Sequence, residues 1–147
     1  MQPLNQNDLK RKIDSAYRVL VIIWLASLTS VGILFAMSVL IPHANGEAQN
    51  KVMSYLIDGL GALCVIISTV IKSTLLNQSV QQQRMEGVVT AYIVPLSLCE
   101  AAALFGLLDH FVIGNPYYYL LFIISIAGFA LHWPRRQHLL DASFRQP

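Results

Sequence analysis

The sequence predicts an all-α fold of the multi-pass membrane class from three observations: its composition, its apolar runs and the placement of its charges. Of the 147 residues, 55% are hydrophobic and 12% are charged, which is too apolar for a soluble domain of this size. Four apolar runs are each long enough to cross a bilayer. We therefore expect a single membrane domain, residues 1–147, with four transmembrane helices in an up-down bundle.

The first apolar run, residues 19–41, follows a polar N-terminal segment of residues 1–18. The run has no small-residue cleavage pattern, so we expect a retained span and not a removed signal peptide. Within the polar segment, Leu9, Ile13 and Tyr17 recur at four-residue spacing. This spacing favours a short amphipathic helix at the membrane surface, with a disordered tail as the alternative.

Three further runs complete the bundle. A hydrocarbon core of about 30 Å needs about 20 helical residues, and the last run is at the short end of the permitted range because Trp133 and Pro134 close it. The polar, glutamine-rich segment 72–86 is predicted to extend the helices on either side of it. External loops are expected at residues 42–51 and 109–116. The three runs are residues 52–71, 88–108 and 117–133.

The positive charges fall almost entirely on one side of the predicted membrane. Nine of the ten lysines and arginines flank the same ends of the four runs, and Lys51 is the exception. The positive-inside rule assigns the crowded side to the cytoplasm. We therefore expect a protein of the cell (inner) membrane with both termini cytoplasmic, the C-terminal tail being residues 134–147. The nine are Lys10, Arg11, Lys12, Arg18, Lys72, Arg84, Arg135, Arg136 and Arg145.

Two acidic residues lie inside the apolar runs. Glu100 is in the middle of an uncharged stretch from Gly87 to Leu108, and Asp58 is counted at a similar depth in the preceding run. A carboxylate near a bilayer centre is costly and marks a functional site by default. Glu100 and Asp58 are thus candidates for a proton or cation site. The alternatives are a single protonated acid bonded to a neighbouring helix, and an Asp58 that lies nearer to water.

Small residues at four-residue spacing predict close helix packing, which implies no activity by itself. They are Gly32, Ala36, Ala102 and Gly106. The sequence contains no phosphate-binding glycine loop, no nucleophile with a placed base and no metal-ligand spacing. None of the four histidines lies mid-span, where a membrane haem would need them. We therefore expect no catalytic residue, no metal and no cofactor, and the chain is predicted not to be an enzyme.

Residues 59–116 carry several motifs in a recognisable order. A Gly-Leu-Gly-Ala sequence at 59–62 opens one apolar helix, and a polar turn contains Gln-Arg at 83–84. The next helix carries the uncharged run 95–108 around one glutamate and is followed by Asn-Pro at 115–116. This segment resembles the helical hairpin of the rotary ATPase proteolipid, the membrane ring subunit c. The resemblance implies that the glutamate, Glu100, occupies the position of that family's ion-carrying carboxylate.

The sequence departs from that family at several positions. The alternating glycines of the first helix end at Gly61, which argues against a tightly packed ring. A sodium-type site of the family has a hydroxyl directly after the glutamate and a tyrosine five residues on, whereas this chain has Ala101 and Phe105. If Glu100 carries an ion, the resemblance implies a proton and not sodium.

These observations predict a non-catalytic integral membrane subunit of a larger or homo-oligomeric complex, with Glu100 as a buried, neutral hydrogen-bond donor. The alternative is a proton-carrying, proteolipid-like subunit that uses Glu100 as its protonatable carboxylate. The expected partners are the lipid bilayer and other membrane subunits or copies of the same chain. No nucleic acid partner is expected.

Overall fold

The computed structural model describes residues 6–41, 51–82 and 85–144. All regular structure in these residues is helical, as the sequence predicts. The elements are α1 (Gln6–Leu40), α2 (Lys51–Gln81), α3 (Met85–Leu108), the π-helical turn η1 (Asp109–Ile113), α4 (Tyr119–Leu131) and α5 (Arg136–Phe144). The loop expected at residues 42–51 lies outside the described residues except for Lys51.

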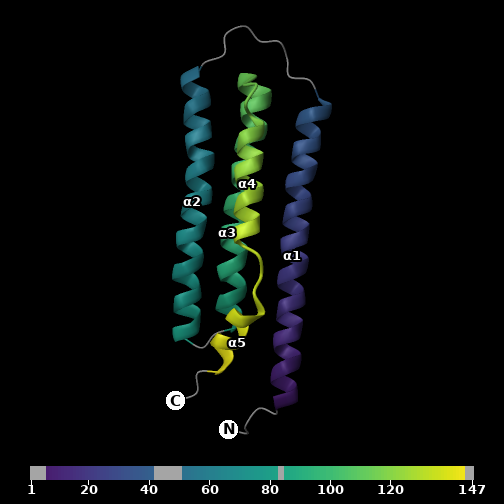
Figure 1. Ribbon diagram of the computed structural model, residues 1–147, viewed down its shortest axis with the longest axis vertical. Helices are drawn as coiled ribbons and strands as arrows, with labels where there is room; N and C mark the ends of the chain where they lie inside the picture. Colours follow the sequence, from purple (N-terminus) through teal and green to yellow (C-terminus); the bar gives the residue numbers. More distant parts are fainter. Residues whose placement is uncertain (1–5, 42–50, 83–84, 145–147) are drawn as a thin grey trace.

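The three longest helices run side by side along the molecule, and α4 lies against α3 in the space between α1 and α2 (Figure 1). The short helix α5 crosses below the end of α4, at the end of the bundle where α1 begins. We call the end of the bundle where α1 begins and α5 lies the α5 end. We call the opposite end, where α2 begins, the Lys51 end.

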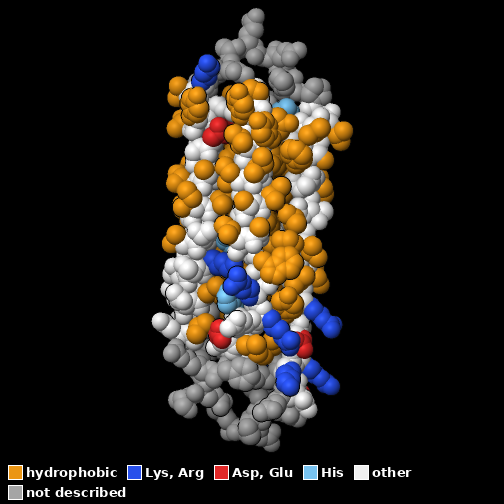
Figure 2. Space-filling view, viewed as in Figure 1, with side chains coloured by type: hydrophobic (Ala, Val, Ile, Leu, Met, Phe, Trp, Pro, Cys, Tyr) orange, Lys and Arg blue, Asp and Glu red, His pale blue; other side chains and the backbone are white. Residues whose placement is uncertain are grey.

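Three helices are long and apolar enough to cross a membrane, namely Lys10–Leu40, Lys51–Gln81 and Gly87–Ile113. Their large hydrophobic side chains are widely exposed. Figure 2 shows hydrophobic side chains over most of the upper part of the molecule and, apart from one group near the top, lysines and arginines only in the lower half. The chain is therefore a helical membrane protein with at least three candidate crossings.

The fourth predicted span, residues 117–133, forms a shorter helix than expected. Helix α4 contains 13 residues, or about 20 Å at 1.5 Å per residue. Its start is delayed because Pro116 and the next two residues form a turn. Its end is fixed at Leu131, since His132 leaves helical geometry and Pro134 lacks the N–H that a continuing helix needs.

The segment before the first span is helical, as expected, but it is continuous with that span and does not form a short helix of its own. One continuous helix runs from Gln6 to Leu40. The apolar positions Ile13, Tyr17, Leu20 and Trp24 keep a spacing of three or four residues across the predicted boundary, so one face of the helix stays apolar. Ile13 is buried in a cluster that also contains Leu139 of α5. This segment is thus part of the folded bundle.

The polar segment 72–86 extends both neighbouring helices, as predicted. Helix α2 continues to Gln81 and α3 begins at Met85. Together with the start of α1, these extensions enclose α5 around a core of their own. That core contains Ile13, Leu20, Val88, Tyr92, Leu139 and Ala142. The α5 end is therefore a small helical cap on the apolar bundle.

Candidate functional site

A buried polar cluster lies at the Lys51 end and is centred on Asp109, whose side chain is fully buried. The hydroxyl of Ser54 on α2 donates to Asp109 Oδ1 at 2.9 Å. The side-chain amide of Asn115 donates to Asp109 Oδ2 at 2.6 Å and also to Ser54 Oγ at 2.6 Å. Both carboxylate oxygens therefore have a partner, which offsets much of the cost of burying this group.

The expected external loop at 109–116 is wrong in its first half, because α3 continues into the π-helical turn η1. Gly114 ends this turn in the left-handed conformation, with φ of 72°. Its N–H donates to the carbonyls of Asp109 and His110, which closes the helix end. The ring of His110 is buried and donates through Nε2 to the carbonyl of Ile41 at 3.3 Å, which joins α3 to the end of α1.

Asp58 lies one turn of α2 below Ser54 and lines a cavity of about 400 Å³ beside this cluster. The acidic group close enough to interact with it electrostatically is Asp109. In the described part of the chain, the Asp58 carboxylate forms no hydrogen bond or ion pair. It is partly buried, so it faces the cavity as an acceptor without a partner.

Asp58 and Glu100 do not share a depth, contrary to the expectation from the sequence. Ser54 contacts Asp109 at one level of the α2–α3 pair, and Ser68 lies 3.8 Å from Cys99 at another. Interpolating between these contacts places Glu100 about 10 Å further from the Lys51 end than Asp58. The two carboxyls therefore do not form a facing pair. The count from the sequence failed because the helices extend beyond the apolar runs used to find their midpoints.

Glu100 lies at the edge of the buried face of α3. Its neighbour Cys99 is fully buried, and one residue turns a helix by about 100°. The Glu100 side chain is accordingly only partly buried. Among the residues that the structure describes, it has no hydrogen-bond or ion-pair partner. Glu100 therefore points toward the periphery of the bundle at about mid-length of α3.

The four small residues separate into two environments. Ala102 is fully buried, and a side-chain carbon added to Gly106 would lie 3.1 Å from Leu121 and 3.2 Å from Phe122 of α4. This pair allows the close approach of α3 and α4. Gly32 and Ala36 are exposed on α1, and nothing lies within 4 Å of an added carbon at Gly32. Among the described residues, none packs against Gly32.

A second polar cluster lies at the α5 end, around Tyr92 of α3. The Tyr92 hydroxyl is 2.7 Å from Nδ1 of His138 and accepts a hydrogen bond from the backbone N–H of Arg135 at 3.1 Å. The ammonium of Lys72 lies 4.7 Å from the centre of the Tyr92 ring and donates to the carbonyl of Leu131. Lys72 thus neutralises the exposed carbonyl end of α4, where a cation is favoured.

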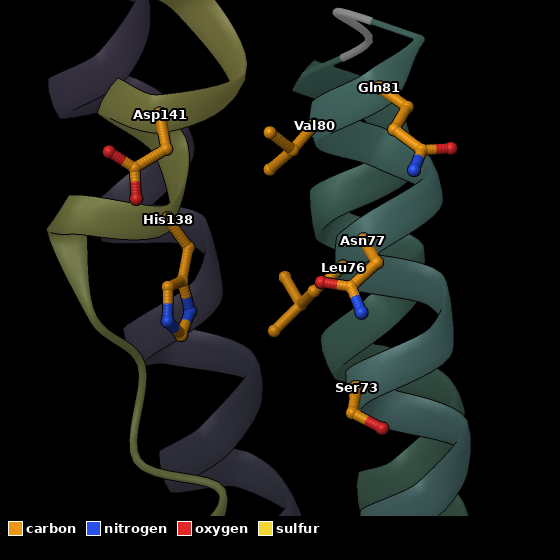
Figure 3. Close-up of a pocket in the computed structure, with 7 residues that line it drawn as sticks. All are labelled: Ser73, Leu76, Asn77, Val80, Gln81, His138 and Asp141. Carbon is orange, nitrogen blue, oxygen red and sulfur yellow. The ribbon is translucent and has the colours of Figure 1, made fainter.

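His138 also lines an open groove of about 620 Å³ between α5 and α2. Figure 3 shows His138 and Asp141 on α5 across the groove from α2, whose Leu76 and Val80 side chains extend toward α5. Burial lowers the pKa of His138 below its ordinary value, and the charges of Lys72 and Arg135 lower this pKa further. The α2 residues that line the groove are Ser73, Leu76, Asn77, Val80 and Gln81.

Little in the sequence indicates either cluster. Asp109 stood at the end of an apolar run, where a polar residue normally marks a loop, and its partners are 55 and 6 residues away. The Gly-Asn-Pro sequence at 114–116 was a signal for a fixed turn. His132 was equally hidden: its ring is buried, and its Nε2 has no hydrogen-bond partner in the described residues.

Neither cluster has the composition of a metal site. No group of three or more histidine, cysteine, aspartate or glutamate side chains comes together within the described ranges. Comparison of the chain with protein-family models, with curated proteins and with solved structures found no match.

Proposed function

We propose that this chain is a non-catalytic integral membrane subunit that assembles with other subunits or with copies of itself. The observation that carries this proposal is Glu100, a peripheral carboxyl at mid-length of a transmembrane helix with no partner in the described part of its own chain. An ionised carboxylate at such a depth costs several kcal/mol (roughly 2.5–3.5 on insertion scales). Glu100 is therefore protonated and donates a hydrogen bond to a neighbouring subunit.

The exposed small residues of α1 support assembly as well. Gly32 and Ala36 lie on the surface with free space above Gly32. Small residues on a lipid-facing helix allow another helix to approach closely, and this contact, unlike one in water, is driven by packing and hydrogen bonds. The protein thus offers both a donor and a close-packing surface to a partner within the membrane.

We further propose that the chain crosses the membrane four times. Lys51 and Lys72 are separated by 21 residues of α2, or about 31 Å, which is close to the thickness of the hydrocarbon core. The α4 segment reaches nearly as far, since Asn115 contacts Ser54 and Leu131 contacts Lys72. The turn before α4 supplies the length that the helix lacks.

The proposed orientation places the α5 end and both termini in the cytoplasm of a cell whose inner membrane holds the protein. Lys10, Arg11, Lys12 and Arg18 lie in the first half of α1, and Arg135 and Arg136 lie at the start of α5. These charges and Lys72 belong to the α5 end, whereas Lys51 belongs to the opposite end. The asymmetry is the one that the positive-inside rule describes.

Two substitutions of Glu100 test the assembly role. Glu100→Gln keeps a hydrogen-bond donor and similar shape, so we expect it to preserve the oligomeric state or partner content of the protein in mild detergent. Glu100→Ala removes the donor and should lower the associated fraction, by about 1 kcal/mol of association free energy for one membrane hydrogen bond. Ser97→Ala, one turn away on an exposed position of the same helix, serves as the control. Equal association of all four proteins would refute the proposal.

A second candidate function is a proton carrier, and the partial exposure of Glu100 favours it because a carrier must exchange its proton. In this case Glu100 would be accessible from the membrane and would ionise during function. Carbodiimides modify protonated carboxyls that are accessible from lipid. Labelling of Glu100 that fades as pH rises, and is lost in Glu100→Gln, would support the carrier; labelling that does not change with pH would exclude it.

A further inference from the structure

We propose that the cavity beside Asp58 binds a small organic cation. Its volume of about 400 Å³ falls within the range of pockets that hold small molecules. The start of α2 forms one wall, and the segment from the end of η1 into α4 forms the other. The cavity is lined by Lys51, Ser54, Tyr55, Asp58, Ile113, Asn115, Pro116, Tyr117 and Leu120.

The unpartnered carboxylate of Asp58 gives the cavity its preference for positive charge. Lys51 lies on the same helix and also lines the cavity, but it forms no ion pair with Asp58. The single ion pair within the described residues joins Arg136 to Asp14 at the α5 end. An acidic side chain inside a transmembrane helix is tolerated where it faces a water-filled cavity, and such positions mark binding sites for ions and substrates.

Asp109 lies behind the α2 wall of the cavity and strengthens the preference of the cavity for positive charge. It is fully buried and interacts electrostatically with Asp58. Its two oxygens are already occupied by Ser54 and Asn115, so Asp109 contributes potential to the site and does not contact the ligand. The lining itself carries one carboxylate, Asp58, and one lysine, Lys51, so the second acidic group behind it shifts the balance of nearby charges toward negative.

The remaining walls suit an organic cation better than a metal ion. The exposed rings of Tyr55 and Tyr117 and the aliphatic side chains of Ile113 and Leu120 line the cavity. Aromatic faces attract ammonium groups, including quaternary ones, and aliphatic side chains favour a ligand with an apolar body. A metal ion would need several further oxygen ligands, and Asp58 is the carboxylate available to it.

The wall that carries Tyr117 is fixed before any ligand binds. The side-chain oxygen of Asn115 accepts the backbone N–H of Tyr117 at 3.0 Å, while its amide group binds Asp109 and Ser54. The same side chain therefore ties the Tyr117 turn to α2 and α3. A preformed wall lowers the entropy cost of binding.

The test is a calorimetric titration of the full chain, purified in an uncharged maltoside detergent, with benzyltrimethylammonium as the probe. We expect saturable binding of one probe per chain. Asp58→Asn should weaken it on the order of tenfold or more, because the charge partner is lost. Tyr117→Leu should weaken it several-fold while keeping the carboxylate. Asp8→Asn, which removes the same charge from an exposed position at the α5 end, should leave it unchanged.

Three results would overturn the proposal. They are the absence of saturable binding to the wild-type chain, equal affinity in Asp58→Asn and the wild type, and displacement of the probe by sodium ions at equal concentration. The last result would assign the site to inorganic cations. Because the titration measures neither Glu100 nor assembly, its outcome is independent of the proposed subunit role.

Discussion

Asp109 shows how one residue can organise a region of the fold. Its carboxylate joins α2, η1 and the turn before α4 through Ser54 and Asn115. Removing it would leave the buried hydroxyl of Ser54 without its acceptor, and the partly buried amide of Asn115 would keep only Ser54. A buried donor left unpaired costs roughly 1–3 kcal/mol. The stability of the Lys51 end therefore depends on the Asp109 side chain. Its position at the start of an expected loop did not predict this role.

Asp109→Ala is accordingly expected to lower the free energy of unfolding by at least about 1–3 kcal/mol. The measurement is unfolding of the purified protein in mixed micelles with increasing denaturing detergent. Asp14→Ala is the control, because Asp14 pairs with Arg136 on the exposed surface, where ion pairs contribute about 0–1 kcal/mol. A loss in Asp109→Ala no greater than that in Asp14→Ala would show that the buried cluster is not stabilising.

Glu100 is the residue whose chemistry the sequence indicated most directly. Its isolation in an uncharged run could be found from the sequence, because an acid in an apolar helix is rare. The direction of the Glu100 side chain could not be found from the sequence, because the packing of α1, α2 and α4 decides which face of α3 is peripheral. The same reason explains Asp58, whose neighbour is Asp109 and not Glu100.

At the scale of elements, α5 is held by a hydrogen bond that depends on protonation. The groups around His138 are Lys72 of α2, Tyr92 of α3, and Arg135 and Asp141 of its own segment. The pKa of His138 in the docked state lies below its ordinary value of 6.5. The released state therefore binds more protons as pH falls, so docking is strongest above about pH 6.5 and weakens below it.

The docking of α5 is measured with a spin label attached to the cysteine of Gln137→Cys, in a chain that also carries Cys64→Ser. We expect the label to be immobile at neutral pH and to become more mobile as pH falls below the ordinary pKa of histidine, about 6.5. In His138→Gln, the mobility of the label should no longer change as the pH falls from neutral to below about 6.5. Mobility that is independent of pH in the wild type, or equally dependent in His138→Gln, would contradict the assignment.

The elements differ in how far the sequence predicted them. The apolar runs located α1, α2 and α3 because hydrophobic periodicity is a local property. The extension of α2 to Gln81 followed from the polar but helix-compatible residues after Lys72. The short α4 and the docked α5 were not predicted, because their limits depend on Pro116, on Pro134 and on the contacts of α5 with α1, α2 and α3.

At the scale of the whole molecule, the bundle combines an apolar section with a helical cap. Along α2, the apolar section extends from Lys51 to Lys72, and the cap begins where α4 ends. The exposed hydrophobic side chains lie on α1, α2, α3 and α4, as expected for a surface that faces lipid or other subunits. Charge placement predicted this division from the sequence, since nine of ten cations lie on the cap side of the four runs.

The proposed subunit role requires Glu100 to be a permanently neutral donor inside a membrane assembly. Infrared spectroscopy of the protein in lipid vesicles tests it directly, because a protonated carboxyl has a carbonyl band that Glu100→Gln removes. We predict that this Glu100-dependent band is present with equal intensity at about pH 6 and about pH 9, well above the ordinary pKa of glutamate. A band that is missing at both pH values, or that disappears as pH rises, would contradict a neutral Glu100.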